Sequence, residues 1–169
     1  MTTAYLPATG VLRAFLVCLV LSATLNLAQA QLKPSEWNPA AARQSWQPLG
    51  QKGPLAASWK LKECHLTQQG LHQEQALLQL QNTGNEPVEI RFRLLHYYDV
   101  NGEVNTNAHH PATGEAYFRF QLAPGQTLSP GCGVGDQHKG LRLIYRFLDG
   151  AHPMQLTQFE LADVTVSQH

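Results

Sequence analysis

A two-residue hydrophobic alternation, repeated along the chain from Leu55 onward, is the strongest constraint on the fold. In the segment VEIRFRL at 88–94, every second residue is apolar. Successive side chains of a strand point to opposite faces, so this period is typical of strands buried on one side. Similar runs cover 57–62, 75–81, 117–122, 141–147 and 156–166, and in the last run the apolar phase changes between Leu161 and Val164. The sequence therefore predicts an all-β domain.

Turn motifs separate these runs. Asn101-Gly102, Pro124-Gly125 and Asp149-Gly150 suit chain reversal, and residues 82–87 contain both Gly and Pro. About seven short strands in roughly 115 residues predict an antiparallel sandwich of two stacked sheets.

Two segments resemble a known fold family. Gln79–Phe92 resembles a strand–turn–strand, and Phe118–Thr127 a later strand with its Pro-Gly turn, of immunoglobulin-like domains in secreted bacterial proteins. The resemblance covers about residues 55–166 and implies an immunoglobulin-like sandwich used in adhesion, scaffolding or binding. Antibody-type domains differ, because no Trp lies between Cys64 and Cys132 here. The resemblance implies no catalytic residues.

Residues 1–30 have the three parts of a secretory signal peptide. Arg13 precedes an apolar run at 14–27, and Ala28-Gln-Ala30 forms a small-x-small cleavage site. The apolar run is shorter than the roughly 20 residues that a spanning helix needs. We therefore expect cleavage after Ala30, a periplasmic or extracellular mature chain, and no stable membrane span after cleavage.

Cleavage there removes Cys18 and leaves Cys64 and Cys132. An even number of cysteines in an exported chain favours a disulfide between them. In the chain-entropy model such a bridge is worth about 4 kcal/mol. The alternatives are free thiols or metal ligands, although two cysteines without CxxC spacing make a poor zinc site.

Residues 31–54 contain four prolines and no sustained period. They predict a linker or an extended arm that precedes the sandwich domain at 55–169. The PAAA sequence at 39–42 favours a short helix near 39–45. Trp37 and Trp46 carry large apolar surfaces, so we expect at least one to dock on the domain; a flexible tether is the alternative.

The charge of the chain limits the kinds of partner that we expect it to bind. The chain has 12 basic and 12 acidic residues, so it lacks the positive excess of a nucleic-acid-binding protein. Arginines nevertheless recur on the outward phase of two runs, and two tyrosines lie near them: Arg91, Arg93, Arg142, Arg146, Tyr97 and Tyr98. If the two runs are neighbouring strands, four guanidiniums share a face that would bind carboxylate, sulfate or phosphate groups. Ordinary cross-strand ion pairs are the alternative.

Histidines provide a second hypothesis. Neutral imidazoles bind zinc or copper well, and the candidate ligands are His96, His109, His110 and His138. Adjacent residues of an extended chain point in opposite directions, so His109 and His110 need a turn to bind one ion. Incidental, solvated histidines are the alternative.

No nucleophile or metalloprotease motif occurs in the chain. The sequence therefore predicts an exported, noncatalytic binding, adhesion or accessory module that recognises a protein or an anionic glycan without a cofactor. One alternative is a His-based metal-binding protein or metalloenzyme. Another is a structural subunit whose N-terminal arm adds a strand to a neighbour. The oligomeric state is left open.

Overall fold

The computed structural model describes residues 31–109, 117–132, 138–150 and 152–168. The expected signal peptide at 1–30 and the candidate ligand His110 lie outside these residues. Within the described residues, no helix is both long enough and apolar enough to cross a membrane.

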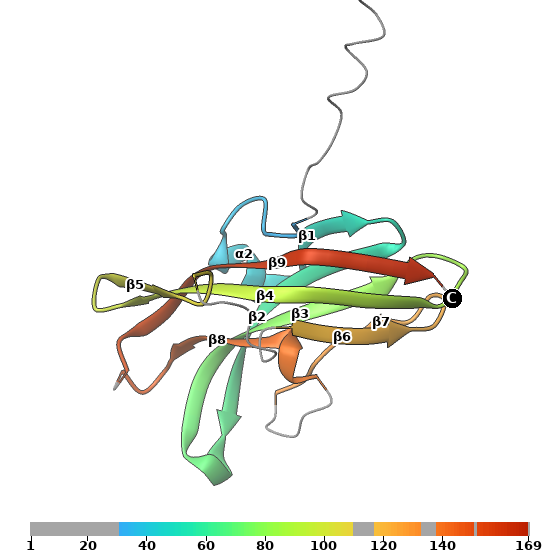
Figure 1. Ribbon diagram of the computed structural model, residues 1–169. Coiled ribbons are helices and arrows are strands. Elements are labelled where there is room, and N and C mark those ends of the chain that lie inside the picture. Colours follow the sequence, from blue (N-terminus) through green and yellow to red (C-terminus); the bar gives the residue numbers. More distant parts are fainter. Residues whose placement is uncertain (1–30, 110–116, 133–137, 151, 169) are drawn as a thin grey trace, which may run out of the picture.

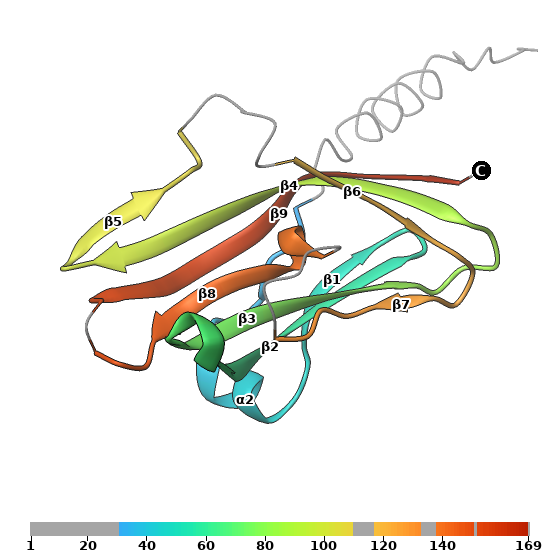
Figure 2. The same cartoon turned by 90° about the horizontal axis from the view of Figure 1, so that it is seen from below.

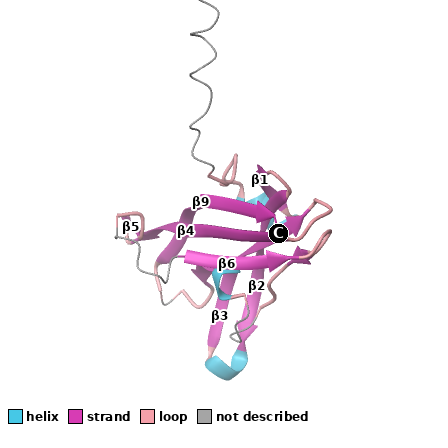
Figure 3. Ribbon diagram, turned by 45° about the vertical axis from the view of Figure 1, so that its right-hand side comes forward, coloured by secondary structure: helices cyan, strands magenta, loops and turns pink. Residues whose placement is uncertain are grey.

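The all-β prediction is confirmed. The described strands are β1 (Gln47–Lys52), β2 (Leu55–Leu66), β3 (Leu71–Asn82), β4 (Val88–Val100), β5 (Glu103–Thr106), β6 (Tyr117–Leu122), β7 (Thr127–Leu128), β8 (Arg142–Phe147) and β9 (Met154–Gln168). All pairings are antiparallel, and the sheet is curled as a half-barrel (Figure 1). Among the described residues, helix is limited to the short segments α2 (Pro39–Gln44), η1 (Thr67–Gln69) and η3 (Lys139–Leu141) (Figure 3).

The expected pair of separate, immunoglobulin-like sheets is not confirmed. The strands form one sheet in the order β1-β2-β3-β8-β9-β4-β5, with β6 paired to β4 and β7 paired to β3. Figure 2 shows β4, β6 and β9 facing β1, β2 and β3 across the interior. The two walls are joined where Arg146 of β8 pairs with Gln155 of β9.

The two-residue alternation correctly predicts the buried faces. Trp59 of β2 and Phe92 of β4 are fully buried, and most of the apolar residues in phase with them are buried as well: Leu55, Ala57, Leu61, Val88, Ile90 and Leu94. The change of phase in β9 is a β-bulge, because the register with β4 shifts between the pairs Arg93–Ala162 and Arg91–Thr165. Asp163 in this bulge has a φ of 54°.

Residues 31–54 pack onto the barrel. The side chain of Asn38 caps α2 by accepting a hydrogen bond from Ala41 N at 3.1 Å. β1 pairs with β2, and Leu32 exchanges backbone hydrogen bonds of 3.0 and 2.8 Å with Leu161 of β9. Trp37 stacks on Trp59 with ring centroids 4.9 Å apart. The short helix and the docked Trp agree with the sequence prediction, whereas a flexible tether does not describe this segment.

Candidate functional site

The four arginines predicted to share a face do not come from neighbouring strands. β9 lies between β4, which carries Arg91 and Arg93, and β8, which begins with Arg142. Arg146 donates from Nε to Glu74 at 2.9 Å. The condition that the two runs form neighbouring strands is therefore not met, and period-2 patterning does not encode which strands pair.

β6 brings another arginine to β4. In the β4–β6 register, Arg91 lies opposite Arg119 and Arg93 lies opposite Tyr117. Directly opposite residues of an antiparallel pair point to the same face. We call Arg91, Arg93, Arg119 and Tyr117 the arginine face. Arg119 belongs to the polar phase of its run, but the sequence pattern gave no sign that this run would lie beside β4.

A buried carboxylate holds two of these guanidiniums. Arg91 Nε donates to Glu89 Oε1 at 2.7 Å, and Arg119 Nη2 donates to Glu89 Oε2. The side chain of Glu89 is 4% exposed, whereas Arg91 and Arg119 are 60% and 59% exposed. The hydrogen bond from Arg119, together with that from Arg91, holds the pKa of Glu89 below its ordinary value despite desolvation. Ionised Glu89 therefore balances one of two adjacent positive charges.

Arg93 and Tyr117 extend the arginine face. Arg93 Nε lies 3.5 Å from Asp163 Oδ2, but this buried nitrogen makes no hydrogen bond in the described structure. Tyr117 is one of the exposed large hydrophobic residues. A cavity of about 400 Å³ adjoins the face and is lined in part by Glu89 and Arg119.

Tyr97 and Tyr98, the two tyrosines predicted to lie near the arginines, have different surroundings. The hydroxyl of Tyr97 lies 3.5 Å from Glu160 Oε1, whereas Tyr98 packs against the core. Desolvation raises the pKa of Tyr98 to about 12. Adjacent strand residues point to opposite faces, so Tyr98 lies on the core side of β4 and Tyr97 on the other side.

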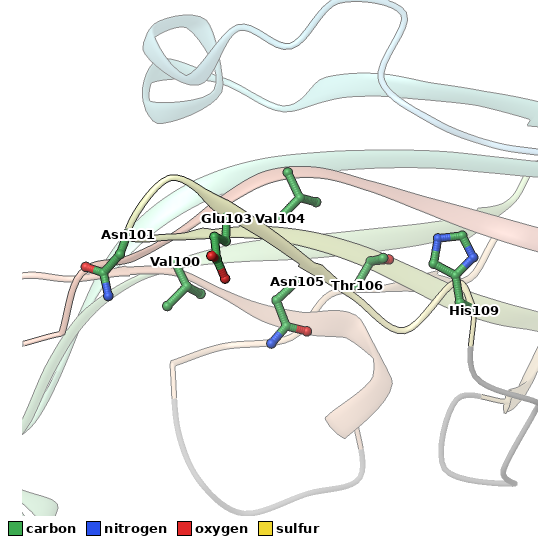
Figure 4. A pocket seen from close by; sticks show the side chains of 7 residues that line it. All are labelled: Val100, Asn101, Glu103, Val104, Asn105, Thr106 and His109. Atoms are coloured by element: carbon green, nitrogen blue, oxygen red, sulfur yellow. The ribbon is translucent and has the colours of Figure 1, made fainter.

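The predicted histidine ligands lie in different settings. Burial lowers the pKa of His96, whose ring centroid is 5.2 Å from that of Tyr98. His109 is exposed at one end of a cavity of about 640 Å³ beside the β4–β5 hairpin (Figure 4). His138 directly precedes η3. The described residues contain no group of three or more His, Cys, Asp or Glu side chains suited to a metal ion.

Cys64 and Cys132 lie at bonding distance, with Sγ atoms 2.00 Å apart, in agreement with the predicted pairing. The bridge connects the distal part of β2 with the segment after β7. It therefore anchors the β2–β3 hairpin to the rest of the molecule.

A second ionic cluster was not foreseen from the sequence. Arg43 of α2 donates from Nε and Nη2 to Glu74 at 2.6 and 3.0 Å, and Arg146 donates to the same carboxylate. Burial favours a higher pKa for Glu74, but the hydrogen bonds and charges of Arg43 and Arg146 outweigh it and hold the pKa below its ordinary value. Glu74 thus joins α2, β3 and β8. No signal in the sequence pointed to this cluster, because Glu74 lies between Gln73 and Gln75 in a polar stretch that does not indicate burial.

Comparisons with protein-family models, with curated proteins and with solved structures give no match to this chain.

Proposed function

We propose that this protein is an exported, noncatalytic binding module whose arginine face recognises an anionic glycan. The observation that carries the proposal is the placement of Arg91 and Arg119 side by side by one buried carboxylate. Two guanidiniums share a single negative charge there, and both remain largely exposed.

The chemistry of these side chains fits sulfate or carboxylate groups. A guanidinium has five N–H donors, and Arg91 and Arg119 donate to Glu89 from Nε and Nη2, respectively. The remaining donors can form paired hydrogen bonds with an oxyanion. Tyr117 adds an aromatic surface next to them, against which a sugar ring can pack.

Export is part of the same proposal. The pattern of residues 1–30 supports a signal peptide, and the close approach of Cys64 and Cys132 suits an oxidising compartment. We therefore place the mature protein in the periplasm or outside the cell. The resemblance of 79–92 and 118–127 to immunoglobulin-like domains supports a binding role, not a particular ligand.

Assembly through the N-terminal arm is less favoured. β1 pairs with β2 of its own chain, and Leu32 pairs with Leu161. Strand addition to a neighbour would have to break these contacts or use the opposite edge of β1.

Heparin affinity chromatography tests the proposal. The variant R91Q/R119Q should elute at much lower salt than the wild type, with at least tenfold weaker binding of a heparin oligosaccharide by calorimetry. The control K33Q/K62Q removes the same charge from two exposed positions elsewhere and should bind like the wild type. R91K/R119K keeps the charge but loses the planar fork, and should bind with intermediate affinity.

Circular dichroism must show that each variant is folded. If R91Q/R119Q and K33Q/K62Q lost the same amount of heparin affinity, the effect would depend only on net charge and the proposal would be overturned. A wild type that heparin does not retain would overturn it as well. Retention on polyglutamate but not on heparin would replace the glycan with an acidic peptide.

A further inference from the structure

We propose that His65 and His72 form a binding site for Cu²⁺ or Ni²⁺ near the tip of the β2–β3 hairpin. The two residues are directly opposite in the antiparallel register, and their Nδ1 atoms are 3.0 Å apart. The connection between the strands is η1 followed by Gly70, which has a φ of 65°. Figure 3 shows this hairpin extending away from the strands that carry the arginine face.

The distance between the two nitrogens suits cis ligands of one ion. Metal–nitrogen bonds are about 2.0–2.1 Å long, so two nitrogens 3.0 Å apart subtend about 95° at a shared ion. Square-planar and tetragonal sites have cis angles near this value, and these geometries are typical of Cu²⁺ and Ni²⁺. Ideal tetrahedral zinc would need a separation of about 3.3–3.4 Å.

The carboxylate of Glu63 favours the tautomer of His65 that metal binding through Nδ1 requires. Glu63 Oε2 lies 3.8 Å from Nε2 of His65, on the side of the ring away from His72. A nearby carboxylate favours a proton on Nε2 and so leaves the Nδ1 lone pair of His65 for a metal ion. Without metal, an imidazole–imidazole hydrogen bond accounts for the same Nδ1–Nδ1 distance; binding would displace its proton.

The disulfide limits the motion of this site. Cys64 lies between Glu63 and His65 and is bonded to Cys132. Both His65 and His72 are exposed, so water or a group from another molecule can complete the coordination sphere. The site thus has two fixed protein ligands and open positions, and it is independent of the proposed glycan binding.

Titration of the disulfide-bonded mature protein with CuCl₂ in a non-coordinating buffer tests the site. Calorimetry should detect one equivalent of Cu²⁺ that is absent or at least tenfold weaker in H65A and in H72A. The double variant H109A/H110A is the control and should keep this equivalent. E63Q should weaken binding several-fold, because the preference for the required tautomer is lost.

Electron paramagnetic resonance identifies the ligands. The wild-type spectrum should show tetragonal Cu²⁺ with two nitrogen ligands, and H72A should lose one of them. A wild type that binds no Cu²⁺ or Ni²⁺, or an H72A variant that binds like the wild type, would overturn the proposal. Loss of the equivalent in H109A/H110A instead would assign the metal to the other histidine pair and would equally overturn it.

Discussion

Glu74 is a buried carboxylate, 1% exposed, that stays ionised because two arginines donate to it. Its pKa in the folded protein is below its ordinary value, so the unfolded chain takes up the proton first as the pH falls. The stability that this carboxylate contributes is therefore present above its ordinary pKa and is lost as the pH falls from there through the folded-state value.

E74Q should remove this acid dependence. We expect a loss of about 1–2 kcal/mol in the free energy of unfolding at pH 7, because the arginines lose a charged acceptor. The difference from the wild type should shrink towards pH 3. Urea denaturation across this pH range measures both effects, with exposed Glu36 changed to Gln as the control. Parallel pH profiles for E74Q and the wild type would contradict the assignment.

Gly140 marks a close approach between η3 and β6. A Cβ atom built at this position would lie 2.1 Å from Cδ1 of Phe118, whereas one at Gly131 meets no atom within 4 Å. We therefore expect G140A to lose about 1–3 kcal/mol of stability through overpacking. G131A should remain within about 0.5 kcal/mol of the wild type in thermal unfolding. Similar melting temperatures for both variants would show that Phe118 can move away at little cost.

Among the elements, β4 is shared by three partners. It pairs with β9 on one side, and with β6 and then β5 on the other. Asn107 occupies the gap between β6 and β5: its amide donates to Leu94 O at 2.9 Å and accepts from His96 N at 3.0 Å. The side chain of Asn107 thus provides the hydrogen bonds that a neighbouring strand would otherwise form with β4 at Leu94 and His96.

N107A should open this part of the β4 edge. Hydrogen exchange at the His96 amide should accelerate at least tenfold, and stability should fall by about 1 kcal/mol. N105A is the control, because Asn105 is an exposed residue of the same hairpin. Unchanged protection at His96 in N107A would mean that the amide is shielded by packing instead.

Local sequence signals predicted individual elements well but not their long-range partners. The alternation located the half-buried strands, the Asn101-Gly102 turn located the β4–β5 hairpin, and the phase change after Leu161 corresponds to the β9 bulge. The position of β6 beside β4 depends on packing between distant segments, so Arg119 could not be assigned to the candidate site. The pairing of His65 with His72 was easier to predict from the sequence, because the register of a hairpin follows from the type and length of its turn.

At the scale of the whole molecule, the N-terminal arm completes the core. Trp37 stacks on Trp59 and meets Phe159 edge-on, with centroids 5.9 Å apart. Trp46, in the same arm, lies instead under Lys60, whose Nζ is 4.8 Å from the ring centroid. Both tryptophans are partly buried, but Trp37 packs against the core cluster whereas Trp46 contacts Lys60.

W37A should cost at least about 2 kcal/mol, because it removes a large aromatic side chain that packs against the core cluster. W46A should cost about 1 kcal/mol or less, because the cation–π contact that it removes is partly accessible to solvent. Urea denaturation monitored by circular dichroism compares the two. Equal losses would show that the arm is held by its backbone pairing and not by Trp37.

The pairing of β4 with β9 also constrains how the chain can fold during synthesis. β4 ends at Val100 and β9 begins at Met154, so β4 emerges long before the strand that covers one of its edges. Until then a nascent chain exposes an apolar strand with unpaired backbone groups, which is a template for aggregation. We therefore expect a chain that folds as it emerges to benefit from a holding chaperone until β9 is available to pair with β4.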